Sequence, residues 1–274
     1  MSISESKRQN SISCPVSRLS YERLSAHLSG EGLPEIKLLG TVGSTNSYAR
    51  SYAEYGDIPE NGIIFATEEQ TAGRGRLGRS FLSDRRGIYI SYLFKPRLSP
   101  DKAIHATTLA AVAAARAIEA VSQADIKIKW VNDLMIGRKK LAGILTEGVF
   151  DEGGKAFRYA IIGIGINLYS KDFPEELREI ATSLEAECGC APDVNLLLAR
   201  LAAELSAAAQ PNDGYIEEYR CRSAVVGKRV SVLTSPPYTA QVLGIGEGGE
   251  LLLRTDTGEK LTLSTGEISI RLTE

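Results

Sequence analysis

The pattern of hydrophobic and polar positions changes once along the chain. In the larger N-terminal part, short apolar or alternating runs typical of strands are interspersed with longer segments of helical spacing, most clearly at 101–121 and 192–208. From Val225 onward, only short strand-like runs between glycine-rich turns remain. This pattern predicts an α+β domain over residues 18–220, followed by a small β-barrel over residues 221–274.

The first residues do not fit either pattern. Residues 1–17 are polar and rich in serine, without the apolar core of a secretory signal, and we expect a disordered leader there. No apolar run approaches the roughly 18 residues that cross a bilayer, so we expect no membrane partner. The four cysteines contain no CxxC pair, and reduced thiols in a cytoplasmic protein are the expected state.

Charge and histidine content exclude several classes of function. The chain has 32 basic and 34 acidic residues, a formal net charge of -2, which does not favour a nucleic-acid partner. Only two histidines, His27 and His105, occur, and there is no HExxH motif. A zinc enzyme or a Ser–His–Asp hydrolase is therefore not expected.

The most distinctive motif is the loop Gly73-Arg74-Gly75-Arg76-Leu77-Gly78, which formally matches the GxGxxG dinucleotide fingerprint. That fingerprint needs a helix directly after it, but here a further loop and a strand follow. What the loop supplies is three guanidinium groups, on Arg74, Arg76 and Arg79, with glycines that permit close backbone approach. Such groups bind carboxylates and phosphates in pairs of hydrogen bonds. A solvated, flexible basic loop is the alternative.

Three further clusters carry candidate chemistry. Ser44, Thr45 and Asn46 stand at a strand-to-helix junction and could bind a small polar group, although a helix N-cap would explain one of them. Lys129 and the Asn132-Asp133 pair end an apolar strand. A lysine drawn inward there needs an anionic partner, which could be a ligand or Asp133.

The third cluster, Gly163-Ile-Gly165-Ile-Asn167, ends another apolar strand. Glycines within a strand often mark close approach of a ligand, and the amide of Asn167 could read the edge of a purine. A bulge followed by a turn asparagine is the alternative.

Together and in this order, these clusters resemble the biotin–protein ligases. The matching segments are GSTN at 43–46, Gln70 with TAGRGRLGR at 71–79, KWVNDL at 129–134, RKKLAGIL at 138–145, GIGIN at 163–167 and GEISIRL at 266–272. The resemblance extends from about residue 36 to the end of the chain. It implies a mixed sheet like that of class II aminoacyl-tRNA synthetases, flanked by helices, with an SH3-like barrel after it.

The resemblance also implies a reaction. Biotin and ATP, with Mg²⁺, would form biotinyl-5′-AMP and pyrophosphate, and a lysine of a biotin carboxyl carrier protein or domain would then take the biotin. Lys129 and Arg76 would be catalytic, and no protein side chain is assigned as a metal ligand. The implied biotin contacts are Ser44, Thr45, Asn46, Gln70, Arg74, Gly75, Arg76 and Lys129. The implied ATP and adenylate contacts are Gly73, Arg74, Arg76, Arg79, Lys129, Asn132, Gly165 and Asn167.

The chain departs from the family pattern in three places. Val131 stands where a proline is usual, and Phe81 where some relatives have tryptophan. Only 43 residues precede Ser44, so we expect a short form without the DNA-binding domain of the repressor relatives and without DNA as a partner. A lipoate–protein ligase of the same fold and a non-catalytic biotin-binding sensor are the alternative functions, and a homodimer stays open.

Overall fold

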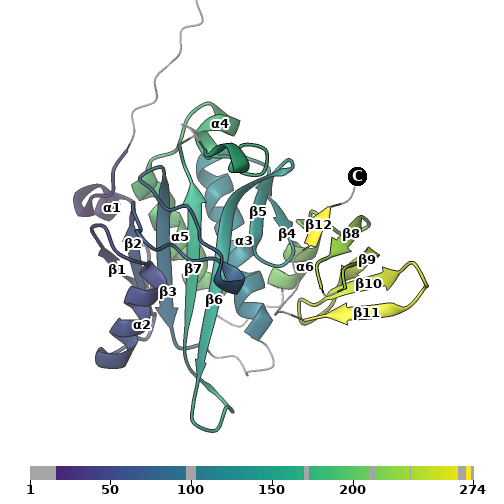
Figure 1. Cartoon of the computed structure of the whole chain (residues 1–274). Helices are drawn as coiled ribbons and strands as arrows, with labels where there is room; N and C mark the ends of the chain where they lie inside the picture. Colours follow the sequence, from purple (N-terminus) through teal and green to yellow (C-terminus); the bar gives the residue numbers. More distant parts are fainter. Residues whose placement is uncertain are drawn as a thin grey trace, which may run out of the picture.

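The computed structural model of the chain describes residues 17–96, 103–169, 173–209, 214–234, 236–264 and 270–272. It contains a seven-stranded mixed sheet flanked by helices and, next to it, a five-stranded antiparallel sheet formed by the C-terminal residues (Figure 1). The predicted fold class is therefore confirmed. The predicted leader at 1–17 lies outside the described residues, apart from its last one.

The larger sheet has the strand order β1-β2-β3-β7-β6-β5-β4. Its strands are β1 (Glu35–Leu38), β2 (Ile63–Thr67), β3 (Gly87–Phe94), β4 (Lys127–Lys129), β5 (Asp133–Ile136), β6 (Lys139–Phe150) and β7 (Phe157–Asn167). The β1–β2 pair is parallel and the pairs that follow it are antiparallel. β6 and β7 are long and pair over most of their length, so they form the centre of the sheet (Figure 1).

Both faces of this sheet are buried, as the period-two alternation of strand side chains shows. In β2, Ile64 and Ala66 join the main core with helices α3 (Ala103–Ser122) and α5 (Val194–Ala208). Ile63 and Phe65 point to the opposite face, where they pack against helix α2 (Thr45–Tyr55). The site described below lies on the α2 face.

Helix α3 corrects the expectation that no apolar run approaches the length needed to cross a bilayer. Its segment Ile104–Ser122 is long and apolar enough to cross a membrane by length and composition, with a mean hydropathy of 1.3. However, 67% of that window is buried inside the fold, because its alanine-rich faces pack against α5 and the sheet. Its burial is that of a core helix.

The remaining helical segments among the described residues are short. They are α1 (Tyr21–His27), the 3-10 turns η1 (Arg76–Gly78) and η3 (Glu175–Leu177), α4 (Leu184–Cys188) and α6 (Gly214–Cys221). After α4, the thiols differ from expectation: Cys188 and Cys221 are free, but Cys190 is in a disulfide. The spacing of the cysteines did not predict this bond.

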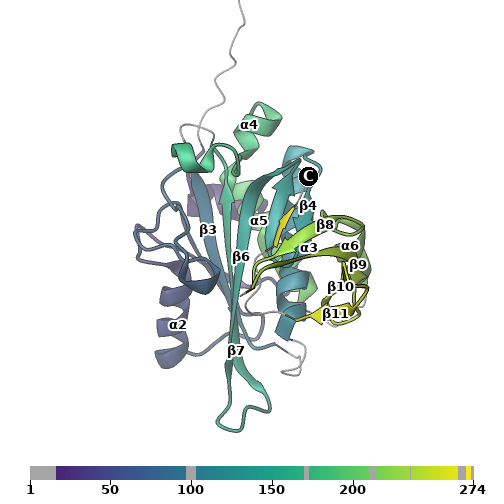
Figure 2. The same ribbon diagram turned by 45° about the vertical axis from the view of Figure 1, so that its right-hand side comes forward.

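The smaller sheet has the order β11-β10-β9-β8-β12. Its strands are β8 (Arg229–Val232), β9 (Tyr238–Ile245), β10 (Leu251–Thr255), β11 (Lys260–Leu263) and β12 (Ile270–Leu272). Its buried side chains, among them Val230, Val242 and Leu253, belong to the same hydrophobic cluster as α3. The small sheet thus packs directly against the larger unit (Figure 2), and the domain limit at residue 221 stays a prediction.

The connection between the two units runs along the edge of the larger sheet. The amide of Ile128 in β4 donates to the carbonyl of Arg222 at 2.8 Å, and the amide of Ala224 donates to the carbonyl of Ile128 at 2.8 Å. The Arg222 guanidinium pairs with Glu119 of α3 and Glu218 of α6. Strand β4 is therefore held between β5 and the segment that leads to the small sheet.

Candidate active site

The floor of the candidate site is made by glycines on one face of β6 and β7. Gly163 and Gly165 alternate along β7 with isoleucines 162, 164 and 166, which bury their side chains in the main core on the opposite face. Gly143 lies opposite Gly165 on β6. Because strand side chains alternate between faces, the isoleucines fix β7 on the main core while the glycines leave the α2 face flat.

The loop that follows β2 passes over this floor. Phe81 at its far end lies on the glycines: a Cβ added at Gly165 would lie 2.6 Å from its ring, and one at Gly143 would lie 3.0 Å from it. The amide of Phe81 donates to the carbonyl of Gly73 at 2.9 Å, closing the loop on itself. A Cβ at Gly73 would meet the Ser83 hydroxyl at 2.2 Å, so this position requires glycine.

One end of the site is lined by neutral polar groups, at the N-terminus of α2. The Gln70 Oε1 accepts hydrogen bonds from the amide of Thr45 at 2.8 Å and from its hydroxyl at 3.1 Å. Its Nε2 donates to the Ser83 hydroxyl at 3.0 Å. Ser44 is the N-cap residue but its side chain makes no capping hydrogen bond, and it lines the cavity instead. At this neutral end Ser44 and Thr45 are buried, Gln70 is half-buried, and Thr45 and Gln70 are hydrogen-bonded to each other.

Asn46 lies behind the neutral end rather than in it. Its Nδ2 donates to Glu147 at 2.7 Å, and its Oδ1 lies 2.6 Å from the Ser91 hydroxyl. A Cβ at Gly163 would lie 2.2 Å from the Asn46 Oδ1. Asn46 therefore fixes the first turn of α2 onto β3, β6 and β7, beneath the residues that line the cavity.

The other end of the site carries positive charge. Arg76 is half-buried and its guanidinium donates to the Asn132 Oδ1 at 3.2 Å, while the Asn132 Nδ2 donates to the Ile144 carbonyl at 2.7 Å. Burial lowers the pKa of Arg76 and the nearby Asp133 opposes this shift, but an arginine stays charged at neutral pH. Arg74 and Arg79 are exposed on the same loop.

Lys129 lies on the β4–β5 hairpin at this cationic end. It is half-buried and stands opposite Asp133 in the strand register. Asp133 in turn accepts a salt bridge from the Lys140 Nζ at 2.6 Å, across to β6. The Lys140 ammonium also lies 5.6 Å from the centre of the Phe81 ring. The β4–β5 hairpin and β6 thus bring Lys129, Asp133 and Lys140 together over the floor.

The two ends meet in one cavity of about 170 Å³. Ten of the predicted site residues line it: Ser44, Thr45, Gln70, Arg74, Gly75, Arg76, Arg79, Lys129, Asn132 and Gly165. Asn46 and Gly73 support the lining from behind, as described above. Asn167 donates from its Nδ2 to the Thr182 carbonyl at 3.0 Å, and it lies two residues beyond Gly165 on the same face of β7.

Sequence reasoning missed several lining residues, of which Lys140 and Tyr89 matter most. Lys140 and Gly143 are three positions apart on β6, so strict alternation would put them on opposite faces. The register shift in the β5–β6 pairing sets Lys140 opposite Met135 and Gly143 opposite Asp133, which puts both on one face. Tyr89 donates to the Asp84 carbonyl at 2.8 Å, and burial raises the pKa of its phenol. The alternation of β3, with odd positions on the α2 face, is the signal that could have placed Tyr89 in the site.

Known sequence families cover both units of the chain. Residues 41–167 match the Biotin/lipoate A/B protein ligase family, and residues 225–271 match the Biotin protein ligase C terminal domain. The chain is 32% identical over 253 residues to the biotin–[acetyl-CoA-carboxylase] ligase of Mycobacterium tuberculosis, a match that covers 87% of this chain and 90% of that protein.

Two further similarities differ in extent. The bifunctional ligase/repressor BirA of Bacillus spizizenii is 42% identical over 151 residues, and this match covers 54% of the chain but only 45% of that relative. The biotin protein ligase from Aquifex aeolicus, solved in complex with biotin and ATP, superimposes with a TM-score of 0.73 at 26% identity. That superposition covers 87% of this chain and 99% of the other.

Proposed function

The chain belongs to the biotin–[acetyl-CoA-carboxylase] ligase family, and we propose that it forms biotinyl-5′-AMP from biotin and ATP and transfers the biotin to a lysine of a biotin carboxyl carrier protein or domain. The observation that carries this proposal is the two-ended cavity, in which neutral hydrogen-bonding groups and a cluster of cations face one space. Biotin has a matching asymmetry: an uncharged ureido head at one end and a carboxylate at the other.

The neutral end suits the ureido head, which offers two N–H donors and a carbonyl acceptor. Ser44, Thr45 and Gln70 supply hydroxyl and amide groups, and the mutual bonds of Thr45 and Gln70 fix their orientation before a ligand arrives. Fixed donors and acceptors select a ligand with the matching pattern, because a mismatched one leaves buried polar groups unpaired. We therefore assign these three residues to the biotin head and Asn46 to their support.

The cationic end suits the reacting groups. The biotin carboxylate must approach the α-phosphate of ATP, and two anions repel each other unless cations lie between them. Lys129 and Arg76 are half-buried cations there, and both would stabilise the charge that develops as the carboxylate oxygen attacks phosphorus. Arg74, Gly75 and Arg79 would close over the adenylate from the loop. This is catalysis by placement and charge, without a protein nucleophile.

The remaining assignments concern the nucleotide. Asn132 and Gly165 line the cavity, and Asn167 lies further along the same face of β7, so an adenine placed beyond the floor would meet it. Gly73 shapes the loop. Mg²⁺ would arrive with the phosphates of ATP, because no three His, Cys, Asp or Glu side chains among the described residues are grouped to hold a metal ion.

ATP–pyrophosphate exchange tests the proposal. With labelled pyrophosphate, we expect label to enter ATP when biotin is added and not when lipoate is added. Exchange that depends on lipoate would assign the site to lipoate, and biotin binding without exchange would indicate a sensor. A cytoplasmic location and the absence of a DNA partner stay predictions, and homodimer formation stays open; this assay addresses none of the three.

A further inference from the structure

The charges that line the cavity are strongly one-sided. Of the lining residues that the structure describes, Arg74, Arg76, Arg79, Lys129 and Lys140 are cations. Asp133 is the one carboxylate in that lining, and no histidine occurs in it. Cations stabilise the anionic substrates of the first half-reaction, so an acidic group among them calls for a separate explanation.

Asp133 is held at the centre of this group by the strand register. It pairs with Lys129 of β4 on one side and with Gly143 of β6 on the other. Directly opposed residues of antiparallel strands project to the same face, and the missing side chain at Gly143 leaves space above the floor. The charged and titratable groups that face Asp133 are Lys129, Lys140 and Arg76, with the Tyr219 phenol of α6 near it.

The second half-reaction, the transfer of biotin to the acceptor lysine, requires that lysine as a neutral amine. An acceptor lysine has an ordinary pKa of about 10.4, so near pH 7.4 only roughly one in a thousand is the nucleophilic free amine. The rest are ammonium ions, which the five cations of the lining repel. Repulsion and desolvation lower the pKa of a lysine that enters the cavity, but its proton still needs an acceptor.

We propose that Asp133 accepts the proton of the incoming acceptor lysine and so generates the amine that attacks the biotinyl-adenylate, an inference that rests on the proposed function. One proton passes from the ammonium to the Asp133 carboxylate. The amine nitrogen then forms a bond to the acyl carbon, and the bond from that carbon to the phosphate oxygen breaks. AMP leaves with the bonding electron pair, and the second nitrogen proton goes to the departing phosphate.

Other lining groups do not fit this task. The Tyr89 phenol is neutral, and burial raises its pKa, so it cannot take a proton from an ammonium ion. Lys140 occupies one oxygen of Asp133, and a carboxylate can accept further donors at the other. The side chain of Asp133 is 24% exposed, so the proton can pass on to solvent between turnovers.

The test compares two nucleophiles on the same adenylate. Hydroxylamine is already a neutral amine at pH 7 and needs no proton acceptor, whereas the lysine of a purified biotin carboxyl carrier domain does. The full-length protein is loaded with biotinyl-5′-AMP, and single-turnover rates are measured with each. For Asp133→Asn, we expect the ratio of the lysine rate to the hydroxylamine rate to fall about 100-fold. Asp133→Glu keeps a carboxylate and should recover part of that ratio.

Asp84→Asn is the matched control, because Asp84 also pairs with a cation, Arg86, but lies outside the cavity lining. Its ratio should equal that of the wild-type protein. An unchanged ratio in Asp133→Asn, or an equal loss with both nucleophiles, would overturn the role of Asp133. If the wild-type protein forms no adenylate in the exchange assay and transfers none, the proposed function fails instead, so the two failures are distinguishable.

Discussion

The neutral and cationic ends of the cavity are built in different ways. At the neutral end, Thr45 and Gln70 bond to each other, and Asn46 fixes them from behind on the sheet. At the cationic end, Arg74 and Arg79 are exposed on a loop, and Arg76 holds to the sheet through Asn132. Neutral groups can satisfy one another before a ligand binds, but like charges cannot. The cationic end is therefore complete only with the anions that it binds.

From this difference we expect that removing a cation slows adenylate formation far more than it weakens biotin binding. In Lys129→Ala, we expect the rate of biotin-dependent pyrophosphate exchange to fall by about 100- to 1,000-fold, because the lysine acts mainly on charge that develops during the attack. Biotin affinity, measured by calorimetry, should change much less.

Lys127→Ala is the control for this prediction. Lys127 lies two residues earlier on β4, pairs with Asp125 at 2.9 Å, and does not line the cavity. Its exchange rate should match that of the wild-type protein. Lys129→Ala with a normal exchange rate would remove Lys129 from the mechanism and would leave Arg76 as the principal catalytic cation.

The neutral end should respond in the opposite way, with loss of binding and stability. In Gly163→Ala, the new Cβ would lie 2.2 Å from the Asn46 Oδ1, so Asn46 must shift and give up bonds that fix the first turn of α2. Overpacking of this kind costs about 1–3 kcal/mol in the free energy of unfolding. We expect that loss in urea denaturation, together with biotin affinity about 10-fold weaker, the equivalent of about 1.4 kcal/mol.

Gly153→Ala is the matched control, since a Cβ there would have no neighbour closer than 3.8 Å. If Gly163→Ala loses stability but binds biotin normally, Asn46 supports the fold without orienting the neutral end. Normal stability with weaker binding would instead place the Cβ in the path of the ligand.

The two ends also differ in how far the sequence predicted them. The succession of strands and helices along the chain follows from the hydrophobic pattern, and Ser44, Gln70, Arg76 and Lys129 were picked out by the motifs that carry them. Within the run Ser44-Thr45-Asn46, however, the sequence cannot separate the residues. Only the path of α2 across β7 turns Asn46 beneath Gly163 and leaves Ser44 facing the cavity.

Lys140 shows the same limit at the cationic end. Its position depends on which residue of β6 faces β5, and a register shift between Leu134 and Met135 changes that pairing. A bulge moves every side chain beyond it by one position, and apolar alternation alone does not reveal it. Sequence reasoning therefore found the charges of the loop but not the ion pair between Lys140 and Asp133 on the floor.

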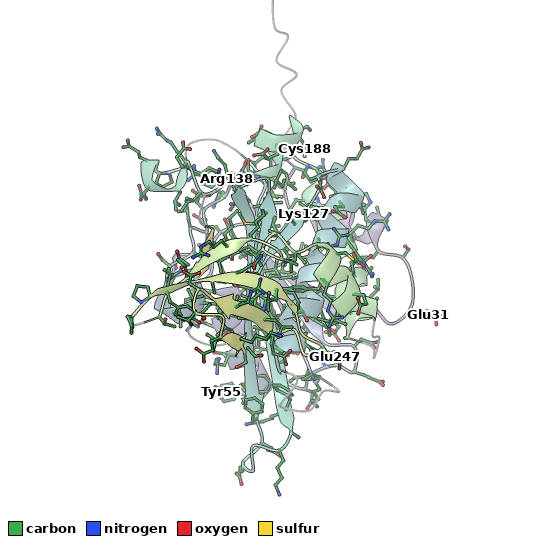
Figure 3. The ribbon with its side chains drawn as sticks, turned by 90° about the vertical axis from the view of Figure 1, so that its right-hand side faces the viewer. Glu31, Tyr55, Lys127, Arg138, Cys188 and Glu247 are labelled. Atoms are coloured by element: carbon green, nitrogen blue, oxygen red, sulfur yellow. The ribbon has the colours of Figure 1, made fainter. Side chains whose placement is uncertain are left out.

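The last contrast is that the cationic end is held from outside the larger sheet. The Trp130 indole N–H, next to Lys129, donates to the Gly249 carbonyl at 2.8 Å, in the turn between β9 and β10 of the small sheet. The next residue, Val131, accepts a hydrogen bond at 3.0 Å from the Tyr219 hydroxyl of α6. Figure 3 looks onto the small sheet, with Lys127 of β4 above it and Glu247 of this turn at its lower edge. The small sheet can thus set the position of Lys129, whereas Thr45 and Gln70 are held by hydrogen bonds within the larger unit.

Trp130→Phe tests this coupling because it keeps an aromatic ring and removes the indole donor. A buried hydrogen bond contributes about 1 kcal/mol, so we expect pyrophosphate exchange to slow by roughly fivefold, mainly through a higher KM for ATP, with little change in biotin affinity. Tyr219→Phe, which removes the bond to the next carbonyl, should give a similar loss. If both variants lower the free energy of unfolding equally but leave the KM for ATP unchanged, the small sheet stabilises the hairpin without positioning Lys129. An equal loss of biotin affinity would mean that the two ends of the cavity share one support after all.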